Sequence, residues 1–338
     1  MAQMNVPDLP DPIDAVITWV DGTDPALAEK RRQYLPDPTA PGAAATRFAS
    51  SDEVIWCTLS ILRFAPFFRK IWFVTDHQTP PVFDAARRHF PDQAHKLHVV
   101  DHRTTFRGYD DALPSFNSTS IIATLHRIPD LAERFVFFND DFFLVRPATP
   151  EDFFQGTRPV LRGGWMGREL DLVEAARRGL DRLRRVPEDK RTFSSKRWML
   201  NAARLAGMRG RTFISTHAPY PMRRSTLAAF ERQHPELWHE NLRHRFRRAE
   251  QFVPEALANH LELKAGNAIT LDRHGAVYIH TARITPAKCA EKLHRAGTDP
   301  AVKFLCVQNL DQAEPQLYTM ITEWLDTRLP GRLDSKEA

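Results

Sequence analysis

The sequence lacks the glycine-rich loops that hold phosphates in many nucleotide-binding enzymes. Neither a Walker segment nor a GxGxxG segment occurs in its 338 residues, so the backbone cradle of P-loop and dinucleotide enzymes is missing. GxSxG and HExxH are missing as well, and these are the common signatures of serine hydrolases and zinc proteases. A kinase, a dinucleotide enzyme or a hydrolase of these kinds is therefore not expected.

Cysteine and long apolar runs are also scarce. Cys57, Cys289 and Cys306 are the three cysteines, and their spacing suits neither a zinc site nor a redox pair, which favours a reducing compartment. No apolar run approaches the roughly 18 residues that span a bilayer, and the opening MAQMNVPDLPDP lacks the parts of a secretion signal. We expect a cytoplasmic protein, at most peripheral to the inner face of the membrane.

The composition is that of a folded, mildly basic protein. Hydrophobic residues make up 42% of the chain, which is enough for a substantial core, and the formal net charge is +5. A positive balance suggests an anionic partner such as a nucleotide, a phosphorylated glycan or a membrane surface. No nucleic-acid partner is expected.

The first part of the chain alternates short apolar runs with stretches of helical period, which predicts a mostly parallel sheet flanked by helices. Strands are expected at residues 15–20, 71–75, 97–100 and 135–138. Helices are expected at residues 50–64, where Ser50 and Glu53 have capping-box spacing, at 82–90, and from Ser118 to before Pro129. The predicted fold is α/β, with a nucleotide-sugar-binding sheet of Rossmann-like or GT-A-like type.

The later part reads as helices with a few strands. Residues 162–211 crowd basic side chains onto two expected helices, which form either a solvated face or a surface for an anionic acceptor or lipid headgroups. Further helices are expected at 254–266 and 285–297, and strands at 276–281 and 303–307. We predict one catalytic unit, with an α/β part at 1–160, a basic helical insertion at 161–212 and the remainder, with a helical C-terminal part, at 213–330.

An acidic residue follows each of the four strands predicted in the α/β part. These are Asp21, Asp76, Asp101 and Asp140, and the last belongs to the stretch FVFFNDDFFLV. An unpaired carboxylate buried beside phenylalanine is costly, and ligands of open α/β sheets bind beyond the carboxyl ends of the strands. The acids are therefore expected along one rim of the sheet, although strands also end in Asp because it suits turns.

Three further clusters contain histidine. His217 lies in the proline-bounded THAPYP turn, His244 and Arg247 are three apart and share one face if their segment is helical, and His126 lies at the far end of the helix that follows FNS. Each alone is more typical of a structural or surface histidine. Together with the acids they supply what phosphoryl transfer needs, namely cations, carboxylates for a metal and a base.

Five segments, in the same order along the chain, resemble the blocks of the Stealth family of sugar-1-phosphate transferases. They are residues 13–25, 47–80, 115–144, 216–252 (THAPYP with NLRHRFRRAEQF) and 303–309. The resemblance implies that a hexose-1-phosphate passes from a nucleotide-activated sugar, foremost a UDP-sugar, to a glycan hydroxyl of a capsular polysaccharide or exopolysaccharide, with release of UMP. The implied partners are the sugar donor, the glycan acceptor and a membrane or capsule-assembly complex.

The same resemblance implies roles for residues. Donor phosphates would lie at Asp21 and at the Asn139, Asp140 and Asp141 triplet, and Asp140 and Asp141 would hold Mg²⁺ or Mn²⁺.

The remaining implied roles fall on basic and amide side chains. His244 would be the base, Arg247 a phosphate contact and His217 a second histidine, while Asn117 and Gln78 would position the substrate.

The chain also departs from the family pattern. Leu59 stands where the family has Arg, with Arg63 one turn on, Gln251 replaces an acid, and Gln308 and Asn309 replace an Asn-Asp pair. Two alternatives therefore stay open: a glycosyltransferase that releases UDP, and an inactive scaffold of capsule assembly.

Overall fold

Five strands form the central sheet in the computed structural model, which describes residues 11–35, 52–185 and 194–329. The strand order is β3-β2-β1-β4-β9; the first four are parallel, and β9 runs antiparallel to β4. The bounds are β1 Ile13–Thr18, β2 Ile71–Thr75, β3 Leu97–Asp101, β4 Arg134–Asn139 and β9 Tyr220–Arg223. This arrangement confirms the predicted α/β fold with a mostly parallel sheet.

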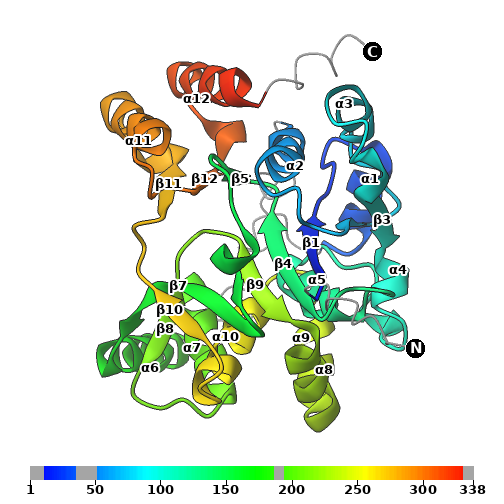
Figure 1. Ribbon diagram of the computed structural model, residues 1–338. Helices are drawn as coiled ribbons and strands as arrows, with labels where there is room; N and C mark the ends of the chain where they lie inside the picture. The colour runs from blue at the N-terminus through cyan, green and yellow to red at the C-terminus, as the bar shows by residue number, and fades with distance from the viewer. Residues whose placement is uncertain (1–10, 36–51, 186–193, 330–338) are drawn as a thin grey trace, which may run out of the picture.

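Two smaller sheets adjoin the central one (Figure 1). One contains β10 (Ile269–Leu271), β7 (Arg158–Met166) and β6 (Phe154–Gln155), with β8 (Thr212–Ser215) paired to β7. The other contains β11 (Ala276–His280), β12 (Phe304–Gln308) and β5 (Phe142–Leu144). The predicted boundary at residue 160 falls inside strand β7. Along the chain, the two predicted basic helices lie between β7 and β8, and these two strands pair with each other.

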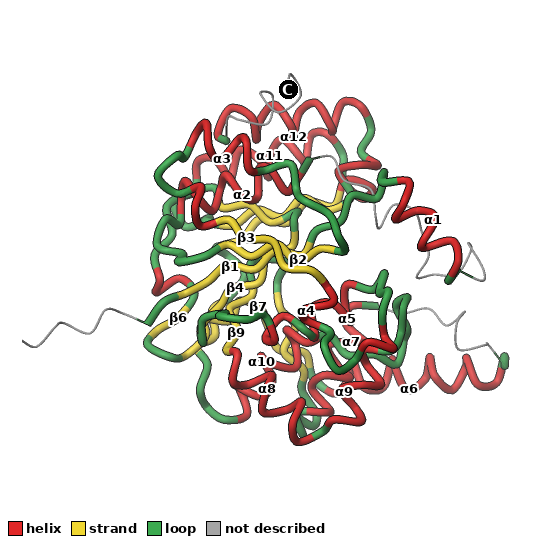
Figure 2. Tube along the Cα trace, turned by 90° about the vertical axis from the view of Figure 1, so that its right-hand side faces the viewer, coloured by secondary structure: helices red, strands yellow, loops and turns green. Residues whose placement is uncertain are grey.

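Helices lie on both sides of the strands, as Figure 2 shows. Above them in this view are α2 (Glu53–Phe64), α3 (Phe83–His89), α11 (Pro286–Thr298) and α12 (Pro315–Arg328). Below them are α4 (His102–Thr105), α5 (Ser118–Ala123), α7 (Ser195–Leu205), α8 (Arg224–Gln233), α9 (Pro235–Leu242) and α10 (Pro254–Lys264). Helix α6 (Arg168–Leu183) projects from the lower group, and α1 (Pro25–Gln33) lies at the margin.

The predicted elements match these closely, with small corrections. Strand β1 ends at Thr18 rather than Val20, and the third predicted helix divides into α5 and a 3₁₀ turn at Leu125–Arg127. Helix α1 was not predicted, because only Leu27 of its PALAEKRRQ sequence is buried and no apolar stripe marks it. The predicted cap Ser50 lies outside the described residues.

A buried carboxylate ties the central strands together at the end of the sheet away from their carboxyl termini. Asp14 on β1 is fully buried and accepts hydrogen bonds from Arg69 (Nε 2.9 Å, Nη2 2.7 Å), from Trp72 Nε1 (3.1 Å) and from the Ala132 amide (2.9 Å). The bonds reach β2 and the turn that leads into β4. A charged acceptor with four donors compensates the cost of its own burial.

Replacing Asp14 with Ala is expected to lower the free energy of unfolding by roughly 2–5 kcal/mol, because buried donors lose their acceptor and Arg69 loses its counter-ion. Urea denaturation measures this change. The matched control is Asp84→Ala, which removes an exposed carboxylate paired to Arg87 on α3 and should cost less than about 1 kcal/mol. Equal losses in the two variants would contradict the role assigned to Asp14.

Candidate functional site

The Asn139, Asp140 and Asp141 triplet lies where the chain passes from the central sheet to a smaller one. Strand β4 ends at Asn139 and pairs with β1 and β9, whereas β5 begins at Phe142 and pairs with β12. The two aspartates therefore form a two-residue turn between strands of different sheets. The phenylalanines on both sides are at most 1% exposed: Phe135, Phe137, Phe138, Phe142 and Phe143. They fix the turn so rigidly that both carboxylates are held beside the apolar core.

A cavity of about 230 Å³ opens at this turn, at the carboxyl ends of the parallel strands. Its acidic wall contains Asp76, which follows β2, together with Asp140 and Asp141. The other lining residues come from the ends of β1, β2, β4 and β12, from α1, α4 and α5, and from the loops after β1, before α5 and after α9: Thr18, Trp19, Val20, Leu27, Val74, His102, Ser115, Phe116, Ser118, Ile121, Asn139, Arg247 and Gln308. This is the position at which open α/β sheets bind ligands.

Burial outweighs the local hydrogen bonds at both aspartates and raises their pKa values. Burial raises the pKa of Asp140 to about 7, with the Asp141 charge as the next cause. Burial likewise raises the pKa of Asp141 to about 7, with the Glu53 charge next. Within the described residues Asp141 Oδ1 is buried without a hydrogen-bond partner, while Oδ2 lies 3.7 Å from Cys306 Sγ. Such a carboxylate pair is suited to a cation.

Arg247 supplies positive charge to the same cavity. Its Nη2 donates to Ser118 Oγ at the first residue of α5, and its guanidinium lies 5.7 Å from the ring centre of Trp198. The cavity thus combines a carboxylate wall with an arginine, which together fit a metal ion and a phosphate group.

His102 also lines the cavity and was missed in the sequence. It is the first residue of α4, 5% exposed, and burial lowers its pKa to about 4, so its ring is neutral at pH 7. The sequence offered one signal for His102: it directly follows Asp101 at the end of β3. That edge of the sheet was already the expected binding site. The same applies to Trp19, which follows β1.

Asp21 and Gln78 lie together but stabilise a turn. The Gln78 side chain accepts from the Asp21 amide (2.9 Å) and donates to the Asp21 carbonyl (3.0 Å) and to Asp24 Oδ2 (2.9 Å). The Asp21 carboxylate itself accepts from the Thr23 amide (2.8 Å). Since Asp24 caps α1 by accepting from Ala26, these bonds hold the start of that helix beside the sheet.

His244 and Arg247 lie in an irregular segment, so the helix that would have placed them on one face does not form there. Helix α9 ends at Leu242, and the following loop is fastened to α5 instead: Asn117 Nδ2 donates to the His244 carbonyl (2.8 Å) and Ser120 Oγ to the same carbonyl (3.2 Å). The loop's polar backbone is thereby satisfied outside a helix.

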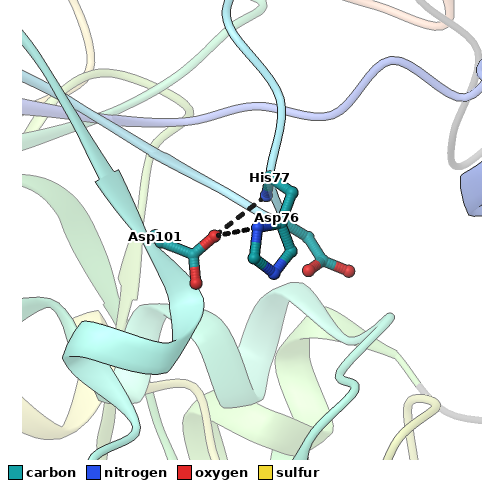
Figure 3. A group of neighbouring side chains, drawn as sticks. All are labelled: Asp76, His77 and Asp101. Carbon is teal, nitrogen blue, oxygen red and sulfur yellow. Dashed lines mark hydrogen bonds and ion pairs between the residues drawn. The ribbon is translucent and has the colours of Figure 1, made fainter.

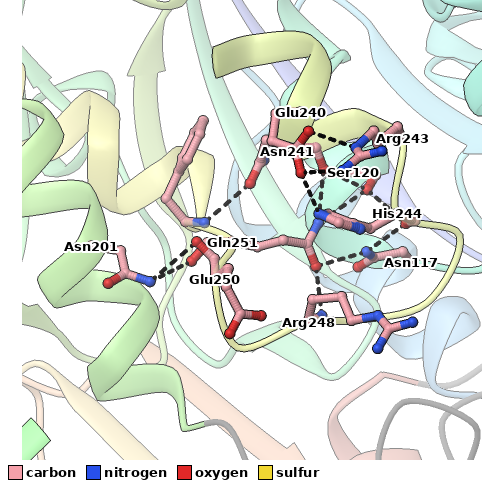
Figure 4. Close-up of polar contacts among 11 residues, drawn as sticks. Asn117, Ser120, Asn201, Glu240, Asn241, Arg243, His244, Arg248, Glu250 and Gln251 are labelled. Atoms are coloured by element: carbon pink, nitrogen blue, oxygen red, sulfur yellow. Dashed lines mark hydrogen bonds and ion pairs between the residues drawn. The ribbon is translucent and has the colours of Figure 1, made fainter. Parts of the chain in front are cut away.

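Gln251 is the centre of that network (Figure 4). Its Oε1 accepts from Asn117 Nδ2 (2.9 Å) and the Arg248 amide (2.8 Å), and its Nε2 donates to the Asn241 carbonyl (2.8 Å). A carboxylate in this place could not donate to Asn241. The departure from the family's acid at this position therefore has a structural use: Gln251 closes the loop that carries His244 and Arg247.

His244 does not line the cavity at Asp140 and Asp141 but a second one of about 360 Å³, together with Glu240 and Glu250. Its Nε2 lies 3.3 Å from Glu240 Oε1. Burial lowers the pKa of His244, and the Glu240 charge partly opposes this. The ring is thus held in the neutral form that a base requires.

His217 lies in the turn between β8 and β9, as expected, and reaches the first cavity indirectly. Its ring stacks on Tyr278 with centroids 4.4 Å apart, and the Tyr278 hydroxyl donates to Gln308 Oε1 (2.5 Å). Gln308 lines the cavity, so this departure from the family pattern belongs to the wall of the site.

A second acidic group lies at the ends of β2 and β3 (Figure 3). Asp76, His77 and Asp101 bring potential ligand atoms within 4.8 Å of one another. However, Lys30 lies 2.6 Å from Asp76, and Asp101 accepts from the amides of His77 (3.0 Å) and Arg103 (2.9 Å). These carboxylates already have partners, whereas Asp141 has a buried oxygen without one. Asp141 thus offers a ligand oxygen without a hydrogen-bond partner, whereas Asp76, His77 and Asp101 offer ligand atoms that lie close together.

Comparison with known proteins identifies the family. The models of Stealth protein conserved region 1 and conserved region 2 match residues 11–37 and 47–160. A capsular polysaccharide phosphotransferase of Streptococcus pneumoniae is 31% identical over 239 residues, covering 64% of this chain and 67% of that protein. The chain belongs to the Stealth family.

Other relatives are longer than this chain. An exopolysaccharide phosphotransferase of Streptomyces coelicolor is 35% identical over 282 residues, which are 82% of this chain but 44% of the relative. The chain thus spans less than half of that protein. Among solved structures, the galactosyltransferase LgtC aligns with 96% of this chain and 99% of its own at 9% identity and a TM-score of 0.45. No helix in the described ranges is long and apolar enough to cross a membrane.

Asp141→Asn is expected to stabilise the metal-free protein at pH 8 by roughly 1–4 kcal/mol. Because the folded pKa of about 7 exceeds the ordinary value near 4, the folded state binds more protons between these values, and stability falls as pH rises through the interval. Asp141→Asn removes the ionisable group and with it this pH-dependent loss of stability. Thermal unfolding in a chelator at pH 5 and pH 8 measures it, with the exposed Asp92→Asn as control. A gain that does not grow with pH would contradict the assignment.

Proposed function

We propose that the protein transfers a hexose-1-phosphate from a nucleotide-activated sugar, foremost a UDP-sugar, to a hydroxyl of a capsular polysaccharide or exopolysaccharide. The observation that carries the proposal is the cavity at the carboxyl ends of the strands, where Asp140 and Asp141 share a space with Arg247. Membership of the Stealth family and the names of the relatives support the same reaction class.

The reaction forms one bond to phosphorus and breaks another. The acceptor hydroxyl attacks the phosphorus next to the sugar and loses its proton to a base. The bond between this phosphorus and the bridging oxygen breaks, and the nucleoside monophosphate leaves with that oxygen. Arg247 would bind the phosphate oxygens, where charge accumulates. A sugar-1-phosphate is thereby joined to the acceptor as a phosphodiester.

Asp140 and Asp141 would hold Mg²⁺ or Mn²⁺, with Asn139 beside them. A bound divalent ion would neutralise donor phosphate charge. Asp21 and Gln78 would keep the loop after β1 in place next to the donor, and Asn117 would hold the loop that carries Arg247, since its amide bonds to both the His244 carbonyl and Gln251.

His244 is proposed as the base, with His217 as the second histidine. The observations that support His244 are its lowered pKa and its position three residues from Arg247. It lines a second cavity together with Glu240 and Glu250, and this cavity is where we place the acceptor.

The released nucleotide distinguishes the reactions. Purified protein incubated with UDP-sugars, a divalent metal and a glycan acceptor is expected to release UMP and to form a phosphodiester on the acceptor, read by chromatography and phosphorus NMR. Release of UDP would replace the proposal with a glycosyltransferase. Donor binding without any product, over a panel of acceptors and nucleotide bases, would favour the inactive scaffold.

His244→Ala is expected to lower turnover by about 10²–10⁴, because general base catalysis contributes on this scale, while donor affinity changes little. Steady-state UMP release and calorimetric donor binding measure the two effects separately. His239→Ala is the matched control, since this exposed histidine on α9 pairs with Asp111 at the surface. Turnover equal to that of the control would remove His244 from the mechanism.

A further inference from the structure

Helix α6 presents an apolar face to solvent. Leu172, Val173, Leu180 and Leu183 are 70%, 56%, 43% and 81% exposed. At about 100° per residue, the three leucines fall within an arc of roughly 80°, with Val173 at its edge. A surface helix of a globular protein normally turns such a face to the core.

The opposite face of α6 is the one that meets the rest of the protein. Glu174 is 2% exposed, and the helix packs chiefly against α7. In Figure 2 the carboxyl-terminal half of α6 extends away from the lower helices. The exposed leucines therefore lie on the side of α6 that faces away from α7, and a different side of the helix contacts the protein.

Basic side chains border the apolar face. Arg177, Arg182, Arg184 and Arg185 are all exposed in or just after the second half of the helix. Arg177 also pairs with Glu174 at 3.2 Å, and Glu169, the exposed acid of the first turn, accepts from the Gly167 amide. Positive charge thus gathers towards the carboxyl-terminal end, next to Leu180 and Leu183.

We propose that α6 docks on an anionic lipid surface. An amphipathic helix with low overall hydrophobicity, exposed leucines and arginines at their border is the type that lies in the plane of a membrane interface. Arginine stems cover apolar surface while their guanidinium groups reach lipid phosphates. The charge complementarity selects an anionic bilayer over a second copy of this chain, whose α6 would bring the same arginines together. The inference is independent of the proposed reaction.

Vesicle co-sedimentation tests the docking. The protein is expected to bind vesicles of phosphatidylcholine with phosphatidylglycerol and to bind pure phosphatidylcholine vesicles more weakly. The double variant Leu172→Glu, Leu183→Glu should lose about tenfold or more in affinity for the anionic vesicles. Leu271→Glu, at a leucine 44% exposed on β10, is the matched control and should bind like the original protein.

Further readouts separate docking from simpler causes. Circular dichroism and thermal unfolding show whether the double variant remains folded. Lack of binding by the original protein would overturn the proposal, as would unchanged binding by the double variant. So would a dimer, seen by light scattering, that the double variant converts to monomer without any vesicle binding. Loss of binding in Arg182→Glu, Arg184→Glu alone, with the leucine variant unaffected, would reduce the contact to charge attraction and contradict docking of the apolar face.

Discussion

The candidate site depends on one constraint: two adjacent carboxylates are held at a turn that apolar strands fix from both sides. The turn is anchored at both ends, because Phe138 and Phe142 are buried and belong to strands of two different sheets. The free energy for this placement comes from aromatic burial, which far exceeds the cost of a perturbed carboxyl. The fold therefore keeps Asp140 and Asp141 in a state that favours a proton or a metal ion, and ligand binding can relieve the repulsion.

The sheet and its binding edge could be predicted because both follow from local patterns. Apolar runs such as IWFVT predict a buried strand, and an acid directly after a strand lies at its carboxyl end. Contacts between distant segments could not be predicted in this way. Nothing near Gln251 in the sequence indicates that its amide bonds to Asn117, 134 positions earlier. The spacing of His244 and Arg247 likewise left open whether their segment is helical, because the loop makes its hydrogen bonds to α5.

The same distinction applies to Asp21 and Gln78, which were expected to bind the donor and which do not line the cavity. Asp21 and Gln78 do meet, yet their polar groups bind each other and the turn before α1. His102 was overlooked although it directly follows Asp101 at the expected edge of the sheet, because only the acids at the strand ends were considered there. The structure shows that it lines the same cavity as Asp140.

Part of the cavity wall comes from a strand late in the sequence. Strand β5, which directly follows the aspartate turn, pairs with β12, more than 150 residues further on, and Gln308 at the end of β12 lines the site. During synthesis the N-terminal strands leave the ribosome first, but β5 has no pairing partner until β12 emerges. The order of translation therefore keeps the cavity incomplete until β12 has left the ribosome.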